Sequence, residues 1–141
     1  MTQIDATLRQ LLSELGASRV TLRQDLPGPY AFPVTHEALA EEVGSLKDEH
    51  TVDLRTQPVV RELARGRQVV QANCRDAFDE PAFHAMLETY GGLAAQIVTP
   101  IFSDERLVAI LSLHQLGAPR DWRPEEIEAC THAAERIGTL L

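Results

Sequence analysis

The stretch QIVTPIFSDERLVAILSLHQL, residues 96–116, decides the fold of this chain. It reads as a strand over 96–102, a tight turn over 103–105 and a second strand over 106–116. A hairpin at this point favours antiparallel pairing over a doubly wound parallel sheet. A loop over 117–123 and an amphipathic helix from near Pro124 to the end follow it. The last third of the chain therefore predicts a sheet with a helix packed on it.

The second strand of this hairpin should have two different faces, because side chains alternate across a strand. One face is purely apolar and carries Leu107, Ala109, Leu111 and Leu113. The other becomes polar toward one end and carries Val108, Ile110, Ser112 and His114. We expect the apolar face to meet the terminal helices and the mixed face to look toward the middle of the chain, where a ligand can sit. Whether Gln96 or Ile97 of the first strand shares a face with His114 depends on the register, which alternation leaves open.

Hydrophobic periodicity and turn residues predict seven elements before the hairpin. They are a helix over 2–15, strands over 19–26 and 30–35, helices over 36–46 and 57–65, a strand over 68–72, and a helix capped by Asp79 that stops at Gly91. Thr2 and Asp5 can cap the first helix. Pro33 places the second strand at a sheet edge, because proline cannot donate to a neighbouring strand.

This order of elements predicts one α+β domain over residues 1–141. Its central antiparallel sheet should carry both terminal helices on one face. The middle of the chain should cover the other face and leave a ligand cup there. At 141 residues the chain is long enough for a real hydrophobic core.

The net charge and residue types argue against several classes of binding partner. The net charge of −8 would repel a nucleic acid or an anionic membrane, so we expect neither as a partner. The sequence shows no apolar run of membrane-spanning length and no signal peptide, so we expect a cytoplasmic location. Cys74 and Cys130 form no CxxC pair, and the five histidines have no metal-ligand spacing, so no metal site is expected.

Two segments near the C-terminal end resemble a known family. AILSLHQ (109–115) and APRDWRPEEIE (118–128) are similar to the closing strand and helix of GAF domains, closest to the branch found in phytochromes and cyanobacteriochromes. SRVTL (18–22) and AQIVTPI (95–101) resemble the first strand and the strand before the last hairpin of that family. The resemblance covers essentially the whole chain and implies a GAF-like, PAS-related form of the α+β architecture.

The same resemblance bears on the ligand. Bilin-binding members of the family carry a Cys-His pair whose cysteine bonds the tetrapyrrole, and the matching residues here are Phe83 and His84. Phenylalanine has no nucleophile, so the usual thioether cannot form. The second histidine that faces the chromophore in the family falls on His114. The acidic motif of many cyanobacteriochromes is matched only by 53–55, which lacks its cysteine.

Three functions remain open. The first is a stand-alone sensor or regulatory module that binds a small molecule non-covalently in the cup, with an unknown ligand. The second is a tetrapyrrole binder, for bilin or haem, without the thioether. The third is an enzyme similar to the GAF proteins that reduce free methionine sulfoxide, although the cysteines of that group are not matched. The predicted ligand-binding residues are His84, His114, Ser112, Gln96, Phe83, Tyr90 and Ile110. If the cup is only core, an unliganded dimerisation module remains.

The terminal helices also predict a homodimer. Helices 2–15 and 125–141 carry more apolar residues than one sheet face can cover, for example Leu11 beside Leu12 and Leu140 beside Leu141. Proteins of the resembling family pair through these helices into a bundle. Because the sequence shows no output domain, we expect a signal to pass through a signalling protein partner or through ligand capture.

Overall fold

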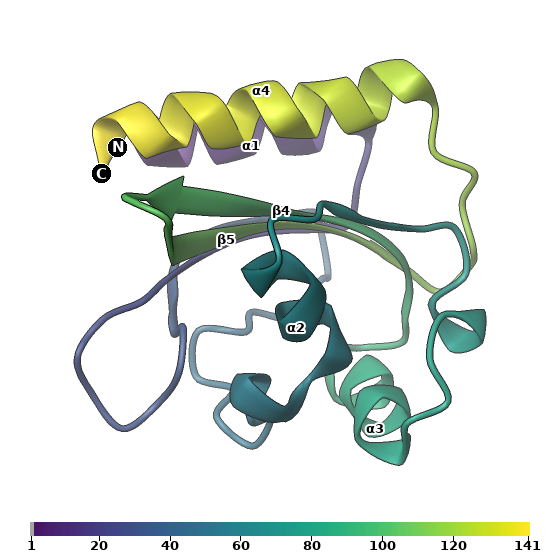
Figure 1. The fold of residues 1–141 in the computed structure, drawn as a ribbon. Coiled ribbons are helices and arrows are strands. Elements are labelled where there is room, and N and C mark those ends of the chain that lie inside the picture. The colour runs from purple at the N-terminus through teal and green to yellow at the C-terminus, as the bar shows by residue number, and fades with distance from the viewer. Residues whose placement is uncertain (1) are drawn as a thin grey trace.

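A computed structural model describes residues 2–141 as an antiparallel sheet with helices on both sides (Figure 1). The five strands pair in the order β2-β1-β5-β4-β3. Their bounds are β1 Arg19–Gln24, β2 Val34–Leu39, β3 Val69–Gln71, β4 Leu93–Ser103 and β5 Arg106–Leu116. Two terminal helices cover one face, and α2 and α3 lie on the other side (Figure 1). The predicted α+β architecture is confirmed.

The predicted hairpin is present as β4 and β5, with β4 starting three residues earlier than expected, at Leu93. Asp104 and Glu105 make the turn with φ of 50° and 66°, the left-handed conformation that a two-residue hairpin loop requires. The register between β4 and β5 shifts near the turn, where Ile101 pairs with Ala109 but Phe102 pairs with Leu107. This bulge exchanges the two faces of the first residues of β5.

Because of this bulge, two side chains of β5 lie on the opposite face of the sheet from the one predicted. Ala109, Leu111 and Leu113 face the terminal helices as expected. Leu107 packs instead with the cluster under α2 and α3, and Val108 packs with the terminal helices. Simple alternation was wrong for these two residues, because it assumes an unbroken ladder.

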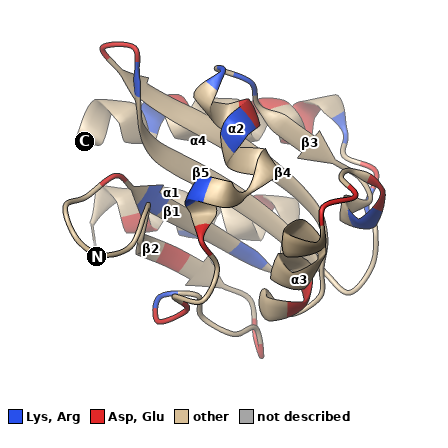
Figure 2. Ribbon diagram, turned by 60° about the horizontal axis from the view of Figure 1, so that its bottom comes forward, with Lys and Arg blue, Asp and Glu red and all other residues tan. Residues whose placement is uncertain are grey.

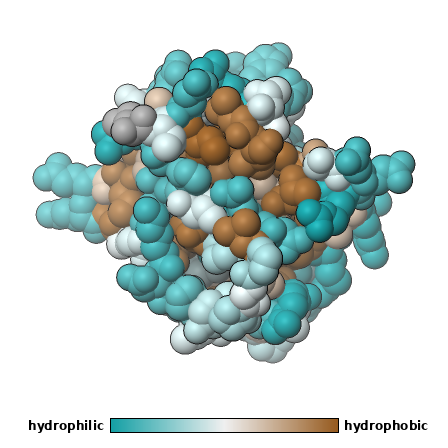
Figure 3. All heavy atoms as spheres, turned by 90° about the vertical axis from the view of Figure 1, so that its left-hand side faces the viewer, coloured by the Kyte–Doolittle hydropathy of each residue, from teal (hydrophilic) through white to brown (hydrophobic). Residues whose placement is uncertain are grey.

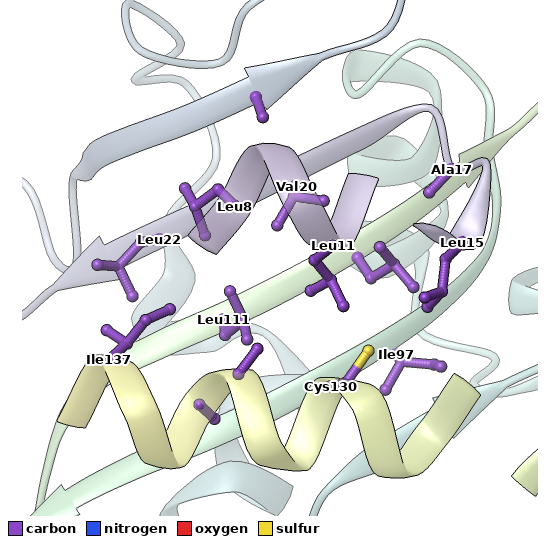
Figure 4. Packing of buried hydrophobic residues seen from close by; sticks show 14 of the residues in the cluster. Leu8, Leu11, Leu15, Ala17, Val20, Leu22, Ile97, Leu111, Cys130 and Ile137 are labelled. Carbon is purple, nitrogen blue, oxygen red and sulfur yellow. The ribbon is translucent and has the colours of Figure 1, made fainter. Parts of the chain in front are cut away.

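The terminal helices are α1 Gln3–Leu15 and α4 Pro124–Leu140. Thr2 and Asp5 form the predicted capping box, with Asp5 N donating to Thr2 Oγ1 at 3.0 Å. Gly16 ends α1 with φ of 58°, a conformation that favours glycine. Both helices lie over the sheet and fill the space between them with apolar side chains (Figure 4). The labelled members of this core are Leu8, Leu11, Leu15, Ala17, Val20, Leu22, Ile97, Leu111, Cys130 and Ile137.

The predicted helix over 36–46 is wrong, and the predicted strand over 30–35 is misplaced. Residues 34–39 form β2, an edge strand as expected, which pairs with β1. The segment after it folds back because the Glu37 carboxylate accepts hydrogen bonds from Leu46 N and Ser45 Oγ. Pairing with β1 outweighs the local helical spacing of Leu39 and Val43, which lie on or near the surface.

The layer on the other face is built from short elements. The helices are α2 Pro58–Ala64 and α3 Pro81–Thr89, and two 3₁₀ turns are η1 Leu54–Thr56 and η2 Cys74–Asp76. Pro58 opens α2 as expected, whereas α3 is capped by Glu80 rather than by Asp79. Within residues 2–141, no helix has the length and apolar character needed to cross a bilayer. Basic and acidic residues are interspersed along the ribbon (Figure 2).

Candidate ligand-binding site

The sheet face toward α2 and α3 buries an unusual number of polar side chains. Because Val20 and Leu22 face the terminal helices, alternation along β1 turns Arg19, Thr21 and Arg23 to this side. Register adds residues of the other strands, since His114 pairs with both Arg19 and Gln96. We call these buried residues the polar face: Arg19, Thr21, Arg23, Gln71, Gln96, Ser112 and His114.

A small cavity lies between the polar face and α2 and α3, and we call it the cup. Its volume is about 40 Å³. Ligand sites for drug-sized molecules occupy roughly 300–1,000 Å³, so the cup in this conformation has room for about one water molecule. It is lined by Arg23, Leu54, Gln57, Val59, Val60, Leu63, Met86, Tyr90, Gln96, Val98, Ile110, Ser112 and His114. The protein's own side chains therefore fill most of the expected ligand volume.

A larger cleft adjoins the cup and opens to solvent. This outer cleft has a volume of about 250 Å³ and shares Arg23 and Leu54 with the lining of the cup. The rings of Tyr30 and His50 stack at 3.9 Å beside it. Its lining consists of Arg23, Pro29, Tyr30, Ala31, Pro33, Val34, Glu49, His50, Thr51, Val52, Asp53, Leu54 and Arg55. Arg23 and Leu54 therefore lie at the border of the two spaces.

His114 is held in one tautomer by Arg19. Arg19 Nε donates to His114 Nδ1 at 3.2 Å, so the ring proton is on Nε2. Two further bonds hold the guanidinium, from Nη1 to Gly44 O and from Nη2 to Tyr90 O at 2.6 Å. Burial and the neighbouring guanidinium of Arg19 hold the pKa of His114 well below its usual range, so the ring is neutral. Burial also lowers the pKa of Arg19 to about 10.

Arg23 and Tyr90 form a second contact at the border of the two spaces. Arg23 Nη2 donates to the Tyr90 hydroxyl at 3.0 Å, and Nη1 donates to Phe32 O at 3.0 Å. The Tyr90 ring also stacks near His114, with ring centres 6.0 Å apart. Burial raises the pKa of Tyr90, so the hydroxyl keeps its proton.

Two buried side-chain oxygens, one at the cup and one on the polar face, have no hydrogen bond with any residue in the range 2–141. Gln57 Oε1 and Thr21 Oγ1 are fully buried and unpartnered. Gln57 uses its amide nitrogen on Ala82 O at 3.3 Å, which leaves the oxygen free at the lining of the cup. Buried polar groups in folded proteins are nearly always paired, so each exception needs an explanation.

The structure brings together five of the seven residues predicted for the ligand site. Tyr90, Gln96, Ile110, Ser112 and His114 all line the cup. Phe83 and His84 are not part of its lining.

The two remaining residues have other contacts. Phe83 is fully buried and meets the Phe78 ring edge-on at 5.1 Å. His84 Nε2 donates to Phe78 O at 2.7 Å, which ties the loop before α3 to the helix. Arg19, Thr21, Arg23 and Gln57 were not among the residues predicted for the ligand site. Because Val20 and Leu22 face the terminal helices, alternation along the strand could have placed the first three on the opposite face.

The cysteines are not arranged for thiol chemistry. Cys130 belongs to the core under the terminal helices and Cys74 to the cluster on the other side of the sheet. Burial raises the pKa of each thiol to about 12, which suppresses the reactive thiolate. Over residues 2–141, no group of three or more His, Cys, Asp or Glu side chains could hold a metal ion.

Comparison with known proteins identifies relatives of this fold. The family model of the GAF domain matches residues 2–141. Among curated proteins, the circadian input-output histidine kinase CikA of Thermosynechococcus vestitus is 23% identical over 79 residues. That alignment takes in 56% of this chain but 11% of the kinase, so the chain corresponds to a small part of that relative's length.

Solved structures agree over nearly the whole chain. The photoproduct state of GAF3 from Slr1393 of Synechocystis sp. PCC6803 has a TM-score of 0.80 at 22% identity, covering 97% of this chain and 89% of that one. The far-red absorbing dark state of JSC1_58120g3 with bound biliverdin IXa has a TM-score of 0.79 at 17% identity, covering 96% and 85%. At these identities the likeness shows the fold alone.

Proposed function

The chain belongs to the GAF domain family, and from this premise we propose that it is a sensory module that binds a small molecule without a covalent bond. The ligand places its polar atoms at the lining of the cup, which includes Arg23, Ser112 and His114, and its remaining volume lies in the outer cleft. It acts by favouring one arrangement of the layers around the sheet over another. A signalling protein then reads that arrangement.

One observation carries this proposal: unpaired donors and acceptors meet at the lining of the cup. His114 Nε2–H is a donor, because Arg19 already occupies Nδ1. Gln57 Oε1 is a buried acceptor without a partner among residues 2–141. Leaving a buried polar group unpaired costs about 1–3 kcal/mol, which a ligand that completes the bonds would recover.

The small volume of the cup sets a condition on binding. In this proposal the ligand reaches His114 from the outer cleft past Leu54, the apolar residue that lines both spaces. Leu54 lies on η1, a turn of three residues within a long irregular segment. Such a segment has little to hold it rigid, so opening at this point costs less than moving a strand.

Mass spectrometry tests the proposal directly. The protein as purified is compared under native and denaturing conditions, and a mass difference identifies a retained small molecule. Affinity for that molecule is then measured in Ser112→Ala and His114→Gln. We expect each to lose about tenfold, or 1.4 kcal/mol, because each removes a polar contact.

Thr99→Val is the matched control, because Thr99 is a buried hydroxyl residue that pairs with Leu111 and so shares its face toward the terminal helices. Its affinity should equal that of the parent protein. An absence of any bound molecule, or equal affinity in all three variants, would contradict the proposal.

A tetrapyrrole is the second candidate ligand, and the biliverdin-bound structure of similar fold favours it. Phe83 excludes the usual thioether at its position, so the pigment would be held non-covalently. The cup would also have to open well beyond its present 40 Å³. A visible absorption band after incubation with biliverdin or haemin would support this candidate, and a colourless protein after gel filtration would reject it. The similar structures are photoreceptor domains, which agrees with binding rather than catalysis.

We also propose a homodimer through the terminal helices. An apolar surface lies at the end of the molecule at which both termini are found (Figures 1 and 3). Its exposed members include Phe102, Leu140 and Leu141. Light scattering coupled to gel filtration should give twice the chain mass, and Leu140→Glu should give a monomer. A monomeric parent protein would overturn this part.

A further inference from the structure

Two arginines are buried on the polar face without a carboxylate partner. The exposed fractions of Arg19 and Arg23 are 1% and 7%. Ion pairs within residues 2–141 use other arginines, most of them on the surface. Every hydrogen bond of the two buried guanidinium groups goes to a neutral acceptor. The sheet therefore holds buried positive charge that contact with the protein's own acids does not balance.

The two arginines differ in how many of their N–H groups donate hydrogen bonds. Arg19 makes three hydrogen bonds and is attracted by the nearby Glu37 carboxylate. Arg23 makes two, to Phe32 O and to the Tyr90 hydroxyl. A guanidinium has five N–H donors, so Arg23 retains three, including Nε–H, that bond to no residue of 2–141. Arg23 lines both the cup and the outer cleft, where a ligand could reach these donors.

Charge around the outer cleft favours a single negative charge. The Glu49 carboxylate accepts hydrogen bonds from Thr51 and from Val52 N, and the Asp53 carboxylate accepts hydrogen bonds from Arg55. Asp53 and Arg55 neutralise each other, and Glu49 is bonded within its own loop rather than to Arg23. A monoanion therefore matches the single charge of Arg23, whereas a dianion would add a second negative charge to a cleft that Glu49 and Asp53 also line. Carboxylates also fit the planar fork of a guanidinium with two parallel bonds.

The walls of the outer cleft indicate the rest of the ligand. The Tyr30 and His50 rings line it together with two prolines. Its volume of about 250 Å³ suits a single ring better than a tetrapyrrole. We propose that the ligand of this GAF domain is a small aromatic monocarboxylate, whose carboxylate binds Arg23 and whose ring lies in the outer cleft. This inference rests on the proposed function and names its ligand class.

Benzoate and benzamide are the test pair, because they differ in charge but hardly in shape. Binding is followed at neutral pH by ligand-observed NMR. Benzoate should bind at least about tenfold more tightly than benzamide, a difference of 1.4 kcal/mol. Equal binding of the two, or no binding of benzoate at millimolar concentration, would overturn the proposal.

Three variants assign the effect to Arg23. Arg23→Met keeps the length and removes the charge, and should lose at least about tenfold in benzoate affinity. Arg23→Lys keeps the positive charge but lacks the planar guanidinium, so its benzoate affinity should lie between those of the parent protein and of Arg23→Met. Arg75→Met is the control, because Arg75 is exposed, is paired with Glu88 and lines neither the cup nor the outer cleft, and it should retain affinity within about twofold.

A stability measurement separates a binding role from a structural one. Arg23→Met removes a buried charge that has no acid partner but also two hydrogen bonds, to Phe32 O and to the Tyr90 hydroxyl, so thermal melting must show that the variant is folded at the temperature of the binding assay. Unchanged benzoate affinity in a folded Arg23→Met protein would overturn the inference. A neutral co-purified molecule would overturn it while leaving the proposed function intact. The absence of any ligand would overturn both.

Discussion

The sheet face toward α1 and α4 packs through aliphatic side chains, whereas the opposite face buries guanidinium, imidazole, amide and hydroxyl groups within the same five strands. On the first face the one buried polar side chain among the strand residues is Thr99, which is paired with Gln68. On the second, seven polar residues are buried and one of them, Thr21, has no partner within residues 2–141. Apolar burial stabilises the fold in proportion to area, whereas a buried polar group contributes only about 1 kcal/mol when it is paired and costs about 1–3 kcal/mol when it is not. The first face is therefore the more uniformly stabilising of the two, and the second is the face on which we propose that the ligand binds.

The largest expected difference between the faces comes from removing one buried leucine from each. Leu111 lies in the packed core under the terminal helices, and Leu63 of α2 lines the cup. Leu→Ala changes in cores cost about 2–5 kcal/mol of unfolding free energy, more where the new cavity cannot collapse. Because Leu63 already borders a void, Leu63→Ala should cost about 2 kcal/mol less than Leu111→Ala, by urea unfolding. Equal costs would show that the two faces are packed alike.

Acid should weaken the domain through the polar face. His114 has a folded-state pKa held well below 6.5 by burial and by Arg19, so the unfolded chain takes up a proton first as pH falls. The stabilisation is complete above pH 6.5 and is lost below it, by at most about 1.4 kcal/mol per pH unit. Carboxylates titrate near pH 4, so urea unfolding between pH 7.5 and 5.5 isolates the histidine.

His114→Gln is the control for this dependence on pH. The amide oxygen can still accept from Arg19 Nε, but the side chain does not titrate. Its unfolding free energy should stay nearly constant across the same range. A slope as steep as that of the parent protein would assign the effect to another group.

The smallest contrast concerns two buried threonines and predicts opposite signs. Thr21 Oγ1 is unpartnered, so Thr21→Val should raise the unfolding free energy by about 1 kcal/mol. Thr99 Oγ1 accepts from Gln68 Nε2 at 2.9 Å, so Thr99→Val should lower it by about 1 kcal/mol. Thermal melting of both variants decides the matter, and a loss in both would place a bound partner on Thr21.

Local pattern predicted the elements that are long or strongly marked. The hairpin, the capping box of α1 and the apolar faces of both terminal helices depend on spacing within one segment, so they could be read from residue order. The strand at 34–39 could not, because Leu39, Val43 and Leu46 repeat at helical spacing while the residues of β1 that pair with this segment lie 11 to 20 positions earlier in the chain.

The candidate site divides in the same way. Alternation alone predicted that Ser112 and His114 lie on the opposite face from Leu111 and Leu113. The same rule applied to the first strand would also have placed Arg19 and Arg23 on one face. Only the tertiary structure put Gln96 beside His114, exchanged Leu107 with Val108 at a bulge and reduced the cup to about 40 Å³. Side-chain direction follows from the period of a strand, whereas register and volume depend on hydrogen bonds and packing between segments far apart in the chain.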